Sequence, residues 1–172
     1  LLASMIQADG AAQAENWAKG LVNNFARAPA GGDRDQIKAV AAGQCDVALA
    51  NTYYYAQMLY GKDAAQKAAA SKVGLFWPNQ NNRGTHINIS GAGVTTAAKN
   101  KENAIKLLEY MVLDDAQRWY SSTNGEFPVK PGITASPELQ SWGNFKRDPV
   151  NLSVLGKNNA QAVMLMDKAG WQ

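Results

Sequence analysis

The fold is decided by residues 46–58, which read DVALANTYYYAQM. Residues 46–50 are short and apolar, as expected of a strand that is buried in a parallel sheet. The polar residues and tyrosines that follow predict that a helix begins where this strand ends, because an asparagine such as Asn51 is a favoured helix cap. In open α/β sheets, ligands bind at the carboxyl ends of the strands, so this stretch is also the best candidate for a binding site.

Three consecutive tyrosines, Tyr53, Tyr54 and Tyr55, form the most unusual feature of this stretch. Adjacent side chains on a helix diverge by about 100°, so the three rings cannot all enter one core. A nearby cation favours the charged form of a phenol, and a phenolate is a hard oxygen donor that suits ferric iron. An amphipathic helix whose rings simply pack explains the same residues. The run by itself leaves both interpretations open.

Composition and charge exclude several classes of protein. The 172 residues are 46% hydrophobic and 18% charged, which fits one globular domain or a large piece of a two-domain protein. The net charge is only +3 and no Lys/Arg cluster occurs, so we expect no nucleic-acid partner. The single cysteine, Cys45, excludes an internal disulfide, and its apolar neighbours predict a buried structural thiol. The chain opens with a helical pattern at Leu1 and shows no signal peptide, from which we expect it to be part of a longer protein.

The rest of the chain alternates between helical and strand-like patterns. Helices are expected at about residues 1–8, 11–26, 63–70, 100–111, 117–120 and 159–169, with short ones after residues 36 and 136, and further strands at residues 73–77 and 85–90. In the loop at residues 29–36, Asp33 and Gln36 fit the capping box of a helix that ends at Gly43. Glycines that lead into a helix also make an anion site, although a loop that only starts a helix explains them equally.

Motifs of the common enzyme classes do not occur in the sequence. There is no Gly-x-Ser-x-Gly elbow, no phosphate-binding loop with Gly-Lys-Ser/Thr and no His-Glu-x-x-His. Cys45 and His86 could form a nucleophile–base pair in principle, but a cysteine inside an apolar strand is poorly accessible. His86 is the only histidine, and we expect it to be a hydrogen-bonded structural residue. We therefore expect a binding protein and no enzyme.

Four stretches, taken in order along the chain, resemble one family. They are RAPAGGDRD at residues 27–35, CDVALANTYY at residues 45–54, GTHINISGA at residues 84–92 and NAIKLLEYM at residues 103–111. Together they are similar to the ferric-iron-binding subunits of bacterial ABC transporters, which are two-lobed periplasmic binding proteins. The Asn-Thr-Tyr-Tyr motif at residues 51–54 is the most specific of these matches.

This resemblance implies an α/β fold of the type II periplasmic-binding-protein kind, mainly the C-terminal lobe with a segment belonging to the other lobe. Residues 1–78 and 126–172 would form the C-terminal lobe, and residues 79–125 would be a crossover strand and helix that return to the N-terminal lobe. The resemblance also implies a periplasmic protein that captures Fe(3+) in the cleft between its lobes and delivers it to an inner-membrane ABC permease. The remaining iron ligands would come from the N-terminal lobe, which has no counterpart in this sequence.

The same resemblance assigns the site residues. Tyr53 and Tyr54 match the family's paired tyrosine ligands, whereas Tyr55 falls one position past the motif and is expected to pack. Asn51 matches a position that can serve a synergistic anion in some members. The loop residues that would line the same cleft are Gly32, Asp33 and Arg34.

Three other functions stay open at this point. The same fold could hold a small anion or a polyamine, with the tyrosines as walls of an aromatic box. An effector-sensing domain of a regulator can share this architecture, and it predicts a DNA-binding helix pair in a preceding segment. Catalysis through Cys45 and His86 would require a reactive, accessible thiol.

Overall fold

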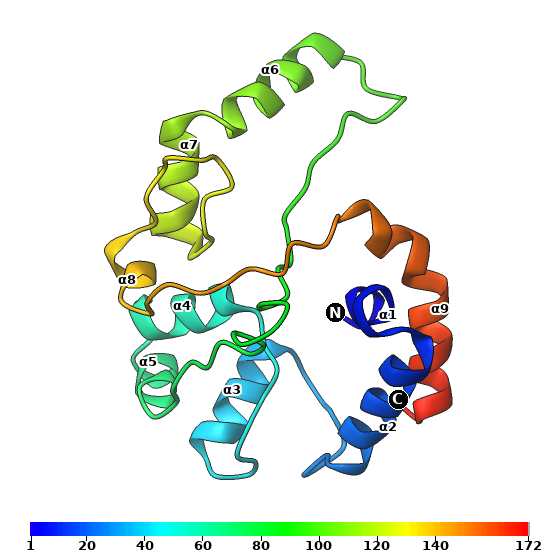
Figure 1. Cartoon of the computed structure of the whole chain (residues 1–172). Helices are drawn as coiled ribbons and strands as arrows, with labels where there is room; N and C mark the ends of the chain where they lie inside the picture. Colours follow the sequence, from blue (N-terminus) through cyan, green and yellow to red (C-terminus); the bar gives the residue numbers. More distant parts are fainter. Residues whose placement is uncertain (172) are drawn as a thin grey trace. The chain divides into compact units, whose positions relative to one another are not determined.

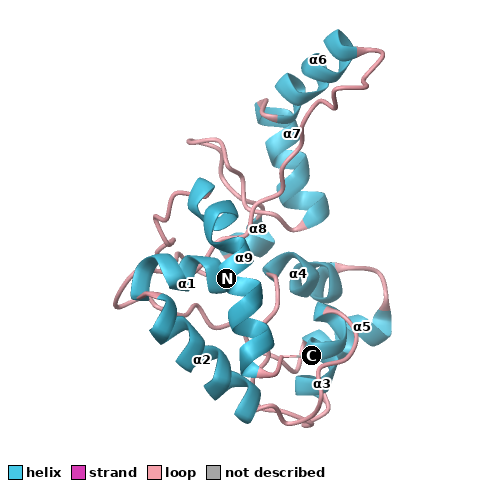
Figure 2. Cartoon of the chain, turned by 90° about the vertical axis from the view of Figure 1, so that its right-hand side faces the viewer, coloured by secondary structure: helices cyan, strands magenta, loops and turns pink. Residues whose placement is uncertain are grey.

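The computed structural model describes residues 1–171, which divide into two compact units. The first unit comprises residues 1–30, 76–88 and 145 onward, and the second comprises residues 31–75 and 89–144. The described residues are folded into helices α1 to α9 and a π-helical turn η1, joined by extended loops (Figures 1 and 2). No helix among residues 1–171 is both long enough and apolar enough to cross a membrane.

The first unit is built from three helices that share one apolar core. They are α1 (Leu2–Asp9), α2 (Ala11–Asn23) and α9 (Ser153–Ala169). The buried side chains between them are Leu2, Ala3, Met5, Ala14, Ala18, Ala162 and Leu165. Gly170 ends α9 in the left-handed conformation that glycine favours, as the sequence predicted. The helix begins six residues before the predicted residue 159, because the Asn151 side chain accepts from the Ser153 backbone N–H at 3.0 Å.

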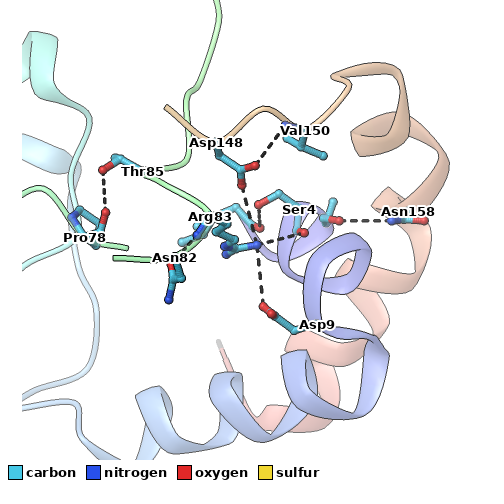
Figure 3. A network of polar contacts seen from close by, with 11 residues as sticks. Ser4, Asp9, Pro78, Asn82, Arg83, Thr85, Asp148, Val150 and Asn158 are labelled. Atoms are coloured by element: carbon cyan, nitrogen blue, oxygen red, sulfur yellow. Dashed lines mark hydrogen bonds and ion pairs between the residues drawn. The ribbon is translucent and has the colours of Figure 1, made fainter. Parts of the chain in front are cut away.

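Arg83 organises the polar side of the first unit (Figure 3). Its guanidinium donates to the Ser4 carbonyl at 3.2 Å, and the same nitrogen lies 3.8 Å from a carboxylate oxygen of both Asp9 and Asp148. The Asp148 side chain is only 6% exposed, whereas the Asp9 side chain is 48% exposed. The two ion pairs therefore differ in environment, although they share one cation.

The second unit contains the tyrosine run. Its elements are α3 (Asp33–Ala41), α4 (Thr52–Tyr60), α5 (Ala64–Ala70), α6 (Lys101–Met111), α7 (Asp114–Trp119), η1 (Tyr120–Asn124) and α8 (Pro137–Gln140). Ile37, Met58 and Ala70 form its buried core, so α3, α4 and α5 pack around one another. Ser136 caps α8 and Pro137 occupies its first turn, as the sequence predicted.

The predicted strands are wrong for the described residues. Residues 46–50, 73–77 and 85–90 are not paired into a sheet within residues 1–171, where an isolated parallel bridge joins Thr85 and Arg147. Val47 is 80% exposed and Phe76 is 83% exposed, and Cys45 is only half-buried. A strand needs a neighbouring strand to satisfy its N–H and C=O groups, and the apolar pattern does not reveal that neighbour.

Other boundaries shift by a few residues. The second helix ends at Asn23 instead of residue 26, and the helix expected at residues 117–120 begins earlier, at Asp114. His86 is half-buried, and its Nδ1 atom has no hydrogen-bond partner among the described residues, contrary to the expected hydrogen bond. The division of residues 1–78, 126–172 and 79–125 between two lobes stays a prediction.

Removing the Asp148 charge should destabilise the first unit. We expect Asp148→Asn to lower the free energy of unfolding by about 1 to 3 kcal/mol, because it removes the buried partner of a mostly buried guanidinium. The matched control is Asp9→Asn, which removes the exposed partner of the same cation and should cost about 0 to 1 kcal/mol. Urea unfolding checks both, and equal costs would contradict the assigned role of Asp148.

The surroundings of His86 predict an acid-sensitive stability. Burial is the largest cause that lowers the pKa of His86 below 6.5, Arg83 adds to it, and Asp148 opposes them. The unfolded chain therefore binds the proton more readily, so this contribution to stability is present above pH 6.5 and is lost as the pH falls below it. Urea unfolding of the wild type and His86→Gln at several pH values should show a smaller loss in the variant. An identical loss in both proteins would contradict the prediction.

Candidate functional site

The start of α4 is tied to the start of α3 by one carboxylate. Oδ2 of Asp33 accepts a hydrogen bond from the backbone N–H of Asn51 at 2.6 Å and another from its side-chain Nδ2 at 3.0 Å. Asn51 has extended backbone dihedrals and stands at the N-cap position of α4, but no side-chain capping bond forms there. Its amide binds Asp33 instead, and this contact sets where Tyr53 and Tyr54 enter the helix.

The two candidate ligand tyrosines lie against one another in the first turn of α4. The centroids of the Tyr53 and Tyr54 rings are 4.4 Å apart, with an angle of 44° between the ring planes. Both residues are half-buried, so their rings are neither inside the core nor free in solvent. The pair therefore brings two phenols together on one side of α4.

The pKa of Tyr53 is raised above 10.0 by its surroundings. The largest cause is its hydrogen bond with Tyr54, followed by partial burial and by negative charge on Tyr54, Asp33 and Glu126. Each of these favours the neutral phenol over the phenolate. The Tyr53 phenol is thus protonated at neutral pH.

Tyr54 meets a cation and the core. The Arg34 guanidinium carbon lies 4.7 Å from the centroid of the Tyr54 ring, a cation–π contact. The residue also packs against the buried cluster of Ile37, Met58 and Ala70. Tyr54 therefore contacts both the guanidinium and the core of the second unit.

Tyr55 is a packing residue, as predicted. Its hydroxyl donates to the Val73 carbonyl at 2.7 Å, and its ring centroid lies 5.5 Å from that of Trp142. Burial raises the pKa of Tyr55, with a smaller contribution from Tyr60. These contacts occupy both the hydroxyl and the ring.

The glycine loop carries its own carboxylate. The Gly32 backbone N–H donates to the Asp35 side chain at 3.0 Å. The capping pair is thus Gly32 with Asp35, and the predicted pair of Asp33 with Gln36 is wrong because the Asp33 carboxylate bonds to Asn51. An anion that binds Gly32 would have to displace Asp35.

Three residues near the tyrosines were missed. Gln57 contacts Arg34 and the Asn124 carbonyl, and Glu126 contributes to the electrostatics of Tyr53. Gln57 could have been found, because it lies three and four residues after Tyr54 and Tyr53 and so shares their helix face. Asn124 and Glu126 are about 70 residues away in sequence, and no local pattern connects them to α4.

The polar groups at this position are phenol and carboxylate oxygens, which are donors of the kind that hard cations prefer. Two phenols adjoin each other, and Asp33 and Glu126 act on Tyr53 electrostatically. Among residues 1–171 no three His, Cys, Asp or Glu side chains converge as a metal site. Cys45 belongs to the second unit and His86 to the first.

Comparison with known proteins identifies the family. Residues 3–147 match the family described as bacterial extracellular solute-binding protein. This chain belongs to that family. It is 46% identical over its whole length to Iron uptake protein A1 of a Synechocystis strain and covers 48% of that protein. The chain thus spans about half the length of the curated relatives that it matches.

Solved structures confirm the predicted fold class. A Trichodesmium protein (IdiA, FutA) in complex with iron and citrate ligands is 53% identical, with a TM-score of 0.93 over 100% of this chain and 54% of that one. A ferric binding protein from Campylobacter jejuni is 39% identical, with a TM-score of 0.96 over 100% of this chain and 54% of that one. The chain therefore shares the fold of the corresponding half of these solute-binding proteins.

The hydrogen bond between the two tyrosines predicts a measurable shift. Tyr54→Phe should lower the pKa of Tyr53 toward 10.0, because it removes the largest cause of the elevation together with the nearest negative charge. Tyrosine ring-carbon NMR during an alkaline titration measures the shift. Tyr55→Phe is the matched control and should leave the pKa of Tyr53 unchanged. If Tyr54→Phe also left the pKa of Tyr53 unchanged, the two hydroxyls would not be coupled.

Proposed function

We propose that the protein to which this chain belongs is a periplasmic solute-binding protein that captures ferric iron through the phenolates of Tyr53 and Tyr54. It then delivers the ion to an ABC permease of the inner membrane. The observation that carries the proposal is the contact of two phenol rings at 4.4 Å in the first turn of α4. Relatives named for iron uptake and ferric binding support it over the whole length of the chain.

Ferric iron suits this pair because it can displace protons from phenols. The raised pKa of Tyr53 keeps its phenol neutral in the absence of a cation, so its oxygen stays available to a metal ion. A trivalent cation at the two oxygens reverses that preference, since it stabilises the phenolate form. Binding is therefore coupled to proton release and weakens in acid.

Two phenolates fill only part of an iron coordination sphere. We infer that the other half of the protein supplies the remaining ligands and that the two lobes close over the metal by a hinge motion. Residues 79–125 would return to that other lobe. A synergistic anion would meet Arg34, the cation next to Tyr54, with Asn51, Gly32 and Asp33 around it. On its own, the chain should bind iron weakly.

The contacts of Tyr54 favour a metal over a cationic amine. An aromatic box needs a free ring face, and the Arg34 guanidinium already lies over the Tyr54 ring. An amine that stacks on this ring face would first have to displace the guanidinium. Membership of an extracellular solute-binding family also favours transport over the sensing domain of a regulator.

A ferric titration followed by visible absorbance tests the proposal. The protein at the full length of its relatives should develop a tyrosinate-to-iron charge-transfer band that saturates at about one equivalent of iron. The Tyr53→Phe/Tyr54→Phe variant should lack the band, and the Tyr55→Phe control should keep it. If adding iron changed neither the absorbance spectrum nor the thermal stability of the wild type, the site would be assigned to an organic ligand instead.

Proton release on binding should depend on both tyrosines. We expect Tyr53→Phe to release about one proton fewer than the wild type per iron bound, because one phenol no longer ionises. The same difference makes apparent affinity fall about tenfold less per pH unit on acidification. Titration of a weakly buffered solution, with iron supplied as the same chelate to both proteins, measures the difference. Equal proton release would contradict tyrosinate ligation by Tyr53.

A further inference from the structure

We propose that Gln57 is a positioning residue that fixes the Arg34 guanidinium over Tyr54 and thereby sets the iron affinity of the site. The inference rests on the proposed ferric-binding function and concerns a residue that lies one turn after the ligand pair on α4. Gln57 touches neither phenol through a described hydrogen bond, so its action is through Arg34.

The Gln57 carboxamide joins two partners from different parts of the second unit. Its Oε1 accepts from a terminal nitrogen of Arg34 on α3, and its Nε2 donates to the Asn124 carbonyl at 3.1 Å, at the end of η1. A guanidinium only donates and a carbonyl only accepts. One orientation of the amide satisfies both, so each bond fixes the orientation needed by the other.

The partner at Asn124 is itself held close to α4. Gly125 adopts a left-handed conformation with φ of 71°, and a Cβ atom there would lie 2.5 Å from the Cβ of Ala56. The same position lies 3.5 Å from the Tyr53 carbonyl oxygen. Only glycine allows this approach without displacement, so the Asn124 carbonyl is a fixed acceptor next to the tyrosine turn.

Holding the Arg34 guanidinium in place affects the site because a flexible arginine side chain does not keep its charge at one position. An arginine side chain has many rotamers, and each hydrogen bond that orders it in the free protein lowers the entropy that remains to be lost on binding. With Gln57 in place, the positive charge stays over the Tyr54 ring, where it stabilises the negative charge that develops when the phenol binds iron. Without Gln57, the guanidinium is free to leave.

The test compares Gln57→Leu with the wild type in the protein at the full length of its relatives. Competition with a ferric chelator should show roughly two- to fivefold weaker iron binding, the value of one exposed cation–π contact. The charge-transfer band should move to longer wavelength, because the phenolate loses its stabilising cation. Gln57→Glu keeps an acceptor for Arg34 and should retain a band closer to that of the wild type.

A double-mutant cycle separates positioning from general structure. If Gln57 acts through Arg34, Gln57→Leu should change neither affinity nor band position in an Arg34→Met background. Equal effects in both backgrounds would overturn the proposal, as would a Gln57→Glu band shifted as far as that of Gln57→Leu. A matched change on an exposed helix position, Gln13→Leu, should leave the spectrum unchanged.

Iron-free NMR distinguishes failure of this inference from failure of the ferric-binding function. The Arg34 side-chain signals should be shifted upfield by the Tyr54 ring current in the wild type and move toward free-arginine positions in Gln57→Leu. A wild type without a charge-transfer band would reject ferric binding, whereas this NMR result would still report the placement of Arg34. Unchanged Arg34 signals in Gln57→Leu would overturn the positioning role whatever the metal result.

Discussion

The paired hydrogen bonds from Asn51 to the Asp33 carboxylate are the contact on which the site depends. They join the first residue of α3 to the residue that precedes α4, and they do so through a charged acceptor, which makes them stronger than bonds between neutral groups. This contact fixes the backbone from which Tyr53 and Tyr54 project. It also places a negative charge near Tyr53, so one carboxylate contributes both to the geometry of the pair and to its proton affinity.

The two phenols have unequal surroundings although they are adjacent in sequence. Tyr53 has Asp33 and Glu126 as its electrostatic neighbours, and Tyr54 lies beneath the Arg34 guanidinium. In the proposed function, negative charge near one phenol would attract a cation to the pair before either proton is lost. Positive charge near the other would favour its anionic form. The proposed arrangement would thus combine attraction of the metal with stabilisation of the ligand that the metal creates.

The sequence predicted the parts of the molecule that local patterns encode. The helix after Asn51, the cap at Ser136 and the end of α9 at Gly170 follow from short-range rules, and the structure confirms them. The packing role of Tyr55, which the structure also confirms, was predicted from the family resemblance. The predicted strands are wrong because strand pairing depends on residues far away in sequence, which the pattern of residues 46–50 does not reveal. The predicted capping box is wrong for a related reason, because the Asp33 carboxylate accepts a hydrogen bond from Asn51, which is 18 positions away in sequence. Helix periodicity could have predicted that Gln57 lies near the tyrosines, whereas no local pattern could have predicted this for Glu126.

Resonance Raman spectroscopy of the ferric-loaded protein, at the full length of its relatives, tests tyrosinate ligation most directly. Excitation into the charge-transfer band should enhance phenolate ring vibrations, and ring-deuterated tyrosine should shift them. In Tyr53→Phe/Tyr54→Phe these vibrations should disappear, while Tyr55→Phe should retain them. An iron-loaded wild type that shows no enhanced phenolate modes would contradict the assignment of Tyr53 and Tyr54 as ligands.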